Sequence, residues 1–97
     1  MKIASVTSSV HRLPPASPWE DATNKVDALE FVVVEVTTDT GLTGTGFSYS
    51  VDIGGTAIHT LIEDYLAALA IGEDPLAYEK LWSRLATQSR RLGLGVN

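Results

Sequence analysis

The hydrophobic periodicity of the chain changes once, at Gly54-Gly55, and this change constrains the fold more than any other feature. Before it, β-branched and apolar residues run or alternate, as in FVVVEVTT at 31–38, which is typical of strands. After it, apolar residues recur every three or four positions from 57 to 69, which is typical of an amphipathic helix. Strands come first and helices follow, without βαβ alternation. The sequence therefore predicts an α+β domain, a three-stranded antiparallel meander followed by a helical bundle.

Turn residues set the limits of the predicted elements. We expect strands at 3–13, 28–38 and 42–49. Prolines interrupt the chain after the first strand and predict a long loop without regular structure at 14–25. Gly72 is expected to end the first helix, and Asp74-Pro75 to begin a second one as N-cap and first helical residue. The second helix then carries Trp82 and Leu85, which we interpret as core residues.

The stretch DTGLTGTGFSYS at 39–50 raises the question of a phosphate-binding loop. Gly41 and Gly46 have the spacing of a Walker-type loop, but Phe47 stands where that loop needs a lysine. A dinucleotide fingerprint needs a third glycine where Tyr49 stands. The stretch is therefore predicted to be a hairpin turn and a returning strand. Two glycines on one face of that strand, at 44 and 46, indicate a close approach by another element or a bend.

Composition excludes several classes of function. Twelve acidic residues oppose seven basic ones, which disfavours nucleic acids and anionic membranes as partners. The absence of cysteine excludes disulfides, thiolate metal sites and cysteine nucleophiles. The longest apolar stretch, 65–71, is too short to span a bilayer, and the N-terminus lacks the apolar core of a signal peptide. We predict a soluble cytoplasmic protein of one domain.

The residue pattern alone supplies no catalytic or metal site. His11 and His59 lack spaced partners for a metal, so a surface or structural role is the expectation for both. Glu63-Asp64 and Glu73-Asp74 are adjacent pairs, and neighbours on a helix do not face each other. We interpret the first pair as a solvated helix face and the second as a helix start.

Several short sequence motifs occur together in a particular order. They are MKIASV and LP at the start, DAT at 21–23, VVVEVTTDTGLTGTGFSYS at 32–50, GG at 54–55 and IGEDP at 71–75. In this order the chain resembles, over nearly all 97 residues, the N-terminal capping domain of the mandelate racemase and muconate lactonizing branch of the enolase superfamily. Within that branch it looks most like the acid-sugar dehydratases that act on galactarate or talarate.

The resemblance implies that residues 1–97 form one part of a magnesium-dependent enzyme. The catalytic (β/α)-barrel, absent from this sequence, would bind Mg²⁺ and carry the base that removes the proton next to a carboxylate. A dehydratase would then lose the β-hydroxyl group. The resemblance implies as partners a sugar-acid substrate, the chain's own barrel domain and further copies in a homo-oligomer. It assigns no catalytic and no metal-binding residue to this chain.

The family resemblance also implies which residues meet the substrate. Two loops, at 14–25 and 47–55, would cover the active site. Their expected substrate-binding residues, acting by packing, hydrogen bonding and water exclusion, are Trp19, Asp21, Thr23, Tyr49 and Val51.

Other interpretations stay open. Trp19 could pack on its own sheet, Tyr49 is equally ambiguous at its strand end, and Asp21 could be only a turn residue. The parent enzyme could be a racemase or cycloisomerase of the same superfamily. The chain could also be a free-standing, non-catalytic binding or interaction module that uses its apolar helix stripe and glycine-rich strand.

Overall fold

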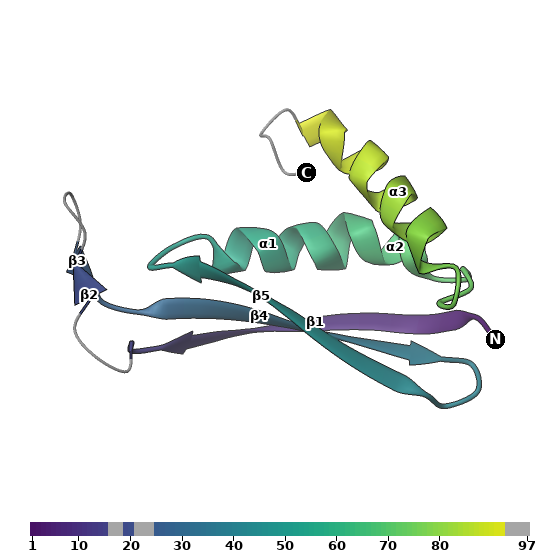
Figure 1. The fold of residues 1–97 in the computed structure, drawn as a ribbon, viewed down its shortest axis with the longest axis horizontal. Coiled ribbons are helices and arrows are strands. Elements are labelled where there is room, and N and C mark those ends of the chain that lie inside the picture. Colours follow the sequence, from purple (N-terminus) through teal and green to yellow (C-terminus); the bar gives the residue numbers. More distant parts are fainter. Residues whose placement is uncertain (16–18, 21–24, 93–97) are drawn as a thin grey trace.

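The computed structural model describes residues 1–15, 19–20 and 25–92, with the backbone alone for residues 19, 20, 25, 26 and 92. Three long strands form an antiparallel sheet in the order β1-β4-β5: β1 (Ile3–Leu13), β4 (Leu29–Thr38) and β5 (Thr43–Val51). Each strand pairs with the next long strand in sequence, so the predicted meander is confirmed (Figure 1).

The segment between β1 and β4 contains a second, very small sheet. Its strands are β2 (Trp19–Glu20) and β3 (Lys25–Val26), which pair antiparallel as Trp19 with Val26 and Glu20 with Lys25. The prediction that residues 14–25 hold no regular element is therefore wrong. Prolines exclude long strands but leave a two-residue ladder possible, because such a ladder needs no side-chain pattern.

The helices follow as predicted, with a different start for the last one. α1 (Gly55–Leu61), a π-helical segment (Ile62–Leu66) and α2 (Ala67–Ala70) form one continuous helical run. After it come α3 (Tyr78–Ser89) and a 3₁₀ turn (Arg90–Leu92). The first helical run ends just before Gly72, which has a φ of 90°. No helix in the described part of the chain has the length and apolar character needed to cross a membrane.

The second helix does not begin at Asp74-Pro75. The Asp74 carboxylate accepts a hydrogen bond from the Leu76 N–H at 2.9 Å, and the Asp74 carbonyl accepts one from the Ala77 N–H at 3.1 Å. Residues 74–77 therefore form a turn that precedes the helix. An aspartate followed by proline is typical of both structures, and here the local Asx turn is the one that forms.

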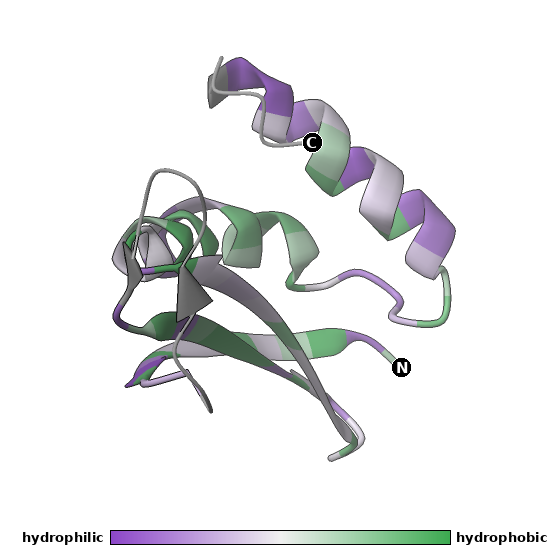
Figure 2. Ribbon diagram, turned by 60° about the vertical axis from the view of Figure 1, so that its left-hand side comes forward, coloured by the Kyte–Doolittle hydropathy of each residue, from purple (hydrophilic) through white to green (hydrophobic). Residues whose placement is uncertain are grey.

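One face of the sheet is covered by helix and the other is open. α1 and α2 lie over the sheet, whereas α3 packs mainly on α2 and is largely hydrophilic (Figure 2). The core is small, and Val32 at its centre is fully buried. Trp82, by contrast, is 69% exposed, so its predicted core role is wrong for the described residues, whereas Leu85 is partly buried. A helical stripe reveals which face is apolar, but not which element covers it.

Candidate functional site

The connections that the sequence analysis singled out lie at one end of the sheet. The register places Leu13, Leu29 and Val51 side by side, so β1 ends, β4 begins and β5 ends at the same place. The β2–β3 ladder and the start of α1 lie at this end as well (Figure 1). Residues 27–28, before β4, and the connection from β5 to α1 therefore meet there.

The connection between β5 and α1 is shorter than predicted. The expected loop at 47–55 is reduced to residues 52–54, because residues 47–51 continue β5 and pair with β4. Alternation of apolar and small residues from Phe47 to Val51 extends the strand. Tyr49 and Val51 consequently belong to the sheet and not to a loop.

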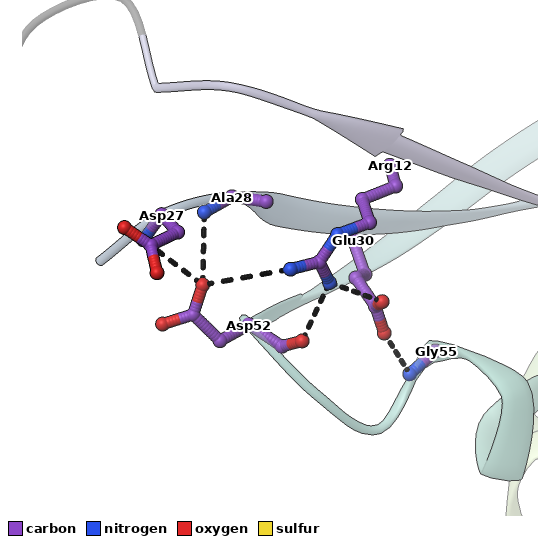
Figure 3. A network of polar contacts seen from close by, with 6 residues as sticks. All are labelled: Arg12, Asp27, Ala28, Glu30, Asp52 and Gly55. Carbon is purple, nitrogen blue, oxygen red and sulfur yellow. Dashed lines mark hydrogen bonds and ion pairs between the residues drawn. The ribbon is translucent and has the colours of Figure 1, made fainter. Parts of the chain in front are cut away.

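Asp52 occupies the turn in an unusual conformation. Its φ of 63° is left-handed, and it is the sole non-glycine residue with positive φ among the described residues. Its Oδ1 accepts hydrogen bonds from the Asp27 N–H at 3.0 Å and the Ala28 N–H at 2.8 Å (Figure 3). Its own N–H donates to the Ala28 carbonyl at 3.0 Å. One residue thus joins the end of β5 to the start of β4 through three hydrogen bonds.

Arg12 extends this contact to β1 and, through Glu30, to the first helix. The Arg12 Nη1 donates to the Glu30 Oε2 and to the Asp52 carbonyl, each at 2.7 Å (Figure 3). The other carboxylate oxygen of Glu30 accepts a hydrogen bond from the Gly55 N–H at 2.8 Å. We call Arg12, Glu30 and Asp52, with the backbone groups that they bind, the Asp52 node.

Hydrogen bonding makes Glu30 a stronger acid than an ordinary glutamate. The pKa of Glu30 lies below its usual 4.5, first because the Gly55 N–H donates to the carboxylate and second because Arg12 does so. Both donors favour the ionised form. The node is therefore assembled with a charged carboxylate at neutral pH.

A second polar cluster ties the helical run to β1. The Ser8 Oγ lies 2.6 Å from the His59 Nδ1 and donates to the Glu63 Oε1 at 3.0 Å, and the Ser8 N–H donates to the same oxygen at 2.8 Å. Both Ser8 donors lower the pKa of Glu63. Glu63 is thus bound to the sheet while it and Asp64 stay exposed, as the predicted solvated face requires.

This cluster has the residue types of a hydrolytic triad in a different arrangement. In a triad the carboxylate binds the histidine and orients it toward the serine. Here the Glu63 carboxylate binds the hydroxyl and the N–H of Ser8, and no hydrogen bond joins it to His59 among the described residues. The predicted structural role of His59 agrees with this contact.

The open face of the sheet carries the exposed aromatic residues. Tyr49 is 59% and Phe47 is 70% exposed, and both rings pack beside Phe31 at centroid distances of 6.2 and 6.0 Å. A shallow hollow of about 450 Å³ lies on this face, almost entirely apolar, lined by His11, Leu13, Phe31, Val33, Thr45 and Phe47. Val51 is 39% exposed; it is the last residue of β5 and directly precedes Asp52.

The structure places some of the predicted site residues and leaves others outside its description. Tyr49 and Val51 lie two residues apart on one strand, so they share the open face. For Trp19 the backbone alone is described, within β2. Asp21 and Thr23 lie outside the described residues. No group of three or more His, Cys, Asp or Glu side chains that could hold a metal ion occurs in the described ranges.

The Asp52 node escaped the sequence analysis. Arg12 and Asp52 are separated by 40 positions, and only the strand register brings them together. A local signal existed for the turn alone, because aspartate and glycine in Asp-Ile-Gly-Gly at 52–55 favour a tight turn with positive φ, whereas the carboxylate binds the distant N–H groups of Asp27 and Ala28.

Comparison with known proteins identifies the domain. The family described as "Mandelate racemase / muconate lactonizing enzyme, N-terminal domain" matches residues 4–92. The chain belongs to this family. It is thus an N-terminal domain of the kind found in enolase-superfamily enzymes, as the resemblance of its short motifs predicted.

Named relatives of this mandelate racemase and muconate lactonizing domain are longer enzymes. The 3,6-anhydro-alpha-L-galactonate cycloisomerase of Streptomyces coelicolor is 28% identical over 94 residues, which cover 96% of this chain and 26% of that protein. The L-talarate dehydratase of Polaromonas sp. JS666, solved with Mg and L-glucarate, is 31% identical with a TM-score of 0.82, over 94% of this chain and 26% of that one. The L-talarate/galactarate dehydratase of Salmonella typhimurium LT2 is 28% identical with a TM-score of 0.80, over 93% and 24%. The chain therefore spans about a quarter of the length of these relatives.

Proposed function

We propose that this chain is the capping domain of a magnesium-dependent enolase-superfamily enzyme that removes the proton next to a carboxylate, and that it acts in a sugar-acid dehydratase. Family membership supports this proposal, as do the two dehydratase structures and the structure that holds Mg and L-glucarate. The remaining part of such an enzyme would be the (β/α)-barrel, with the base and the metal ligands at the carboxyl ends of its strands.

The metal would be bound outside this chain. The described residues offer no cluster that fits an octahedral, oxygen-rich Mg²⁺ site, and the acidic groups of the Asp52 node are engaged with backbone N–H groups and Arg12. In enolase-superfamily enzymes such an ion stabilises negative charge that develops on the substrate carboxylate. No step of that chemistry is assigned to a residue of the present domain.

The domain would contribute substrate contacts and water exclusion. We propose Trp19, Asp21, Thr23, Tyr49 and Val51 as these contact residues. Support comes from the geometry of one sheet end, where β1 ends, residues 27–28 meet the turn after β5, and β5 carries Tyr49 and Val51. Tyr49 combines an exposed apolar ring with a hydroxyl that can bind a sugar oxygen. This meeting of both connections at one sheet end is the observation that carries the proposal.

The test requires the natural polypeptide that contains this chain. It would be incubated with Mg²⁺ and a panel of sugar mono- and diacids, and products would be followed by mass spectrometry and NMR. Loss of one water with formation of a keto acid supports a dehydratase. Conversion without mass change, or solvent deuterium at the carbon next to the carboxylate, supports a cycloisomerase or racemase. Absence of conversion for every acid in the panel would contradict the sugar-acid proposal.

A pair of variants tests the contact residues. Tyr49→Ala should raise KM, whereas Phe47→Ala removes an equally exposed ring from the same face two residues farther from the sheet end and should leave KM near wild type. Equal effects of the two substitutions would contradict the assignment of Tyr49.

The cycloisomerase alternative has its own support, since one relative carries that activity. Assembly into a homo-oligomer is a further proposal, supported by the apolar residues on the open sheet face and on α3. A free-standing binding module would use the same surfaces. Intact mass of the native product and light scattering separate these outcomes, because the capping domain requires a polypeptide far heavier than 10.4 kDa.

A further inference from the structure

We propose that Asp52 is a positioning residue: it locks the turn at 52–54 to the start of β4, and thereby sets where the end of β5 meets the substrate. The inference rests on the proposed function, because it concerns substrate contacts made at this end of the sheet. Asp52 itself would touch no substrate.

The backbone of Asp52 shows that the turn is held in one state. A left-handed aspartate is tolerated because its short side chain can bond locally, but it persists only where the surroundings fix it. Here the carboxylate binds two consecutive N–H groups, of Asp27 and Ala28, and the Asp52 N–H binds the Ala28 carbonyl. Rotation of the turn would break all three hydrogen bonds together. The end of β5 and the start of β4 therefore move as one unit or not at all.

Arg12 and Glu30 extend the lock to two further elements. Arg12 binds the Asp52 carbonyl and the Glu30 carboxylate, and Glu30 binds the first N–H of α1. Two carboxylates, of Glu30 and Asp52, form ion pairs with this single guanidinium, at 2.7 and 4.0 Å (Figure 3). The Arg12 side chain is half exposed, so its ion pair adds little to stability. Its geometry, with one nitrogen donating to two elements, is suited to fixing a position.

The position of the turn at 52–54 affects the open face of the sheet, because the turn directly follows β5. Val51 directly precedes Asp52, and Tyr49 lies two residues before Val51 on the same face. A displacement of the turn is transmitted along the strand to both side chains. Because misplacement of about 1 Å can cost on the order of a hundredfold in a rate, a shift too small to unfold the domain would still be visible in kinetics.

The experiment uses the full natural polypeptide and three substitutions. Asp52→Gly removes the carboxylate while keeping a residue that favours positive φ, so the backbone is not strained. Asp52→Asn keeps an acceptor oxygen and tolerance of the left-handed region. Ser50→Ala is the matched control: its hydroxyl is buried, close to the node, and has no hydrogen-bond partner among the described residues.

Two readouts are expected to change together. With L-glucarate and Mg²⁺ as the probe, Asp52→Gly should raise KM by about tenfold with a smaller change in kcat, and Asp52→Asn should restore most of the loss. Hydrogen–deuterium exchange should increase at 27–28 and at 52–55 in Asp52→Gly and not elsewhere in the sheet. Ser50→Ala should match wild type in both measurements.

The inference and the proposed function fail in different ways. Exchange that increases at 52–55 alone, or over the whole sheet, would overturn the lock. An unchanged KM in Asp52→Gly, with wild-type turnover intact, would overturn the positioning role. If wild type converts neither L-glucarate nor any other sugar acid, the proposed function fails, and with it the substrate role of Asp52, while the exchange pattern still decides whether the lock exists.

Discussion

Replacement of Gly55 by alanine should destabilise the domain by about 1–5 kcal/mol. A Cβ at this position would lie 2.9 Å from the Glu30 Oε1, 3.1 Å from the Glu30 Cβ and 3.1 Å from the Val10 Cγ1. The carboxylate could swing away, but the Glu30 Cβ and the valine methyl stand on neighbouring strands and cannot. Relief of the clash must therefore come from a shift of the start of α1, or from loss of the Gly55–Glu30 hydrogen bond.

The magnitude follows from three contributions. Overpacking of a filled site costs about 1–3 kcal/mol. A buried backbone N–H left without a partner, as Gly55 would be if the Glu30 carboxylate moved, costs about 1–3 kcal/mol. Replacing glycine by alanine restricts the unfolded chain and returns about 0.4–1 kcal/mol. Destabilisation is therefore the net result.

The other glycines provide matched controls for this substitution. A Cβ at Gly44 meets nothing within 4 Å and φ there is ordinary, so Gly44→Ala should change stability by less than about 0.5 kcal/mol. Gly41 also has open space but a φ of 88°, so Gly41→Ala isolates backbone strain, expected at about 1 kcal/mol. Urea unfolding of the 97-residue chain, followed by far-UV circular dichroism, would rank the three variants. Equal unfolding midpoints for Gly55→Ala and Gly44→Ala would refute the close packing of α1 on β1 and β4.

The remaining predictions concern pH, the core and α3. The pKa values of Glu30 and Glu63 are lowered in the folded chain, so their stabilising contribution is complete above the ordinary value of 4.5 and is lost as pH falls through the lowered values. Thermal unfolding from about pH 6 to about pH 3 should show this loss, and a Glu30→Gln, Glu63→Gln double variant should show a flatter profile; identical profiles would contradict the assignment. Val32→Ala removes two methyl groups from a fully buried side chain and should cost about 2–3 kcal/mol in urea unfolding, whereas a cost below about 1 kcal/mol would mean that the site collapses freely. Trp82→Ala should change the stability of the 97-residue chain by less than about 0.5 kcal/mol, since the side chain is largely exposed, and a larger loss would place it in the core after all.

Local patterns predicted an element well wherever burial of one apolar face stabilises it. The valine-rich run before Thr38 and the stripe after Gly55 each have a period that suits only one type of structure. The helix start at Asp74-Pro75 failed because a capped helix and an Asx turn begin with the same residues. The choice between them depends on contacts that sequence spacing does not show.

The site was harder to predict than the fold, because its contacts join distant positions. Tyr49 and Val51 were predicted as substrate contacts from the family resemblance, and that role stays a prediction; the structure places them on the open sheet face and not in a loop. Arg12 lies in β1 and Asp52 in the turn after β5, and each is an ordinary charged residue in its own neighbourhood. Their meeting requires the register of β1, β4 and β5 to be known, which a single sequence does not provide.

The small core explains why polar contacts between elements are important in this domain. The apolar side chains buried in the described part are those of Ile3, Ala28, Val32, Ala67 and Ala70, and three of these are alanines. Such a core supports the contact between helix and sheet but leaves the ends of the strands weakly specified by packing. Hydrogen bonds at Asp52 supply that specification at one end of the sheet, and those of Ser8, in the middle of β1, fix the helical run on the sheet. Polar networks of this kind fix geometry more than they add stability. The same domain can therefore leave its aromatic face open, as the proposed substrate contacts require, while the end of β5 keeps a defined position.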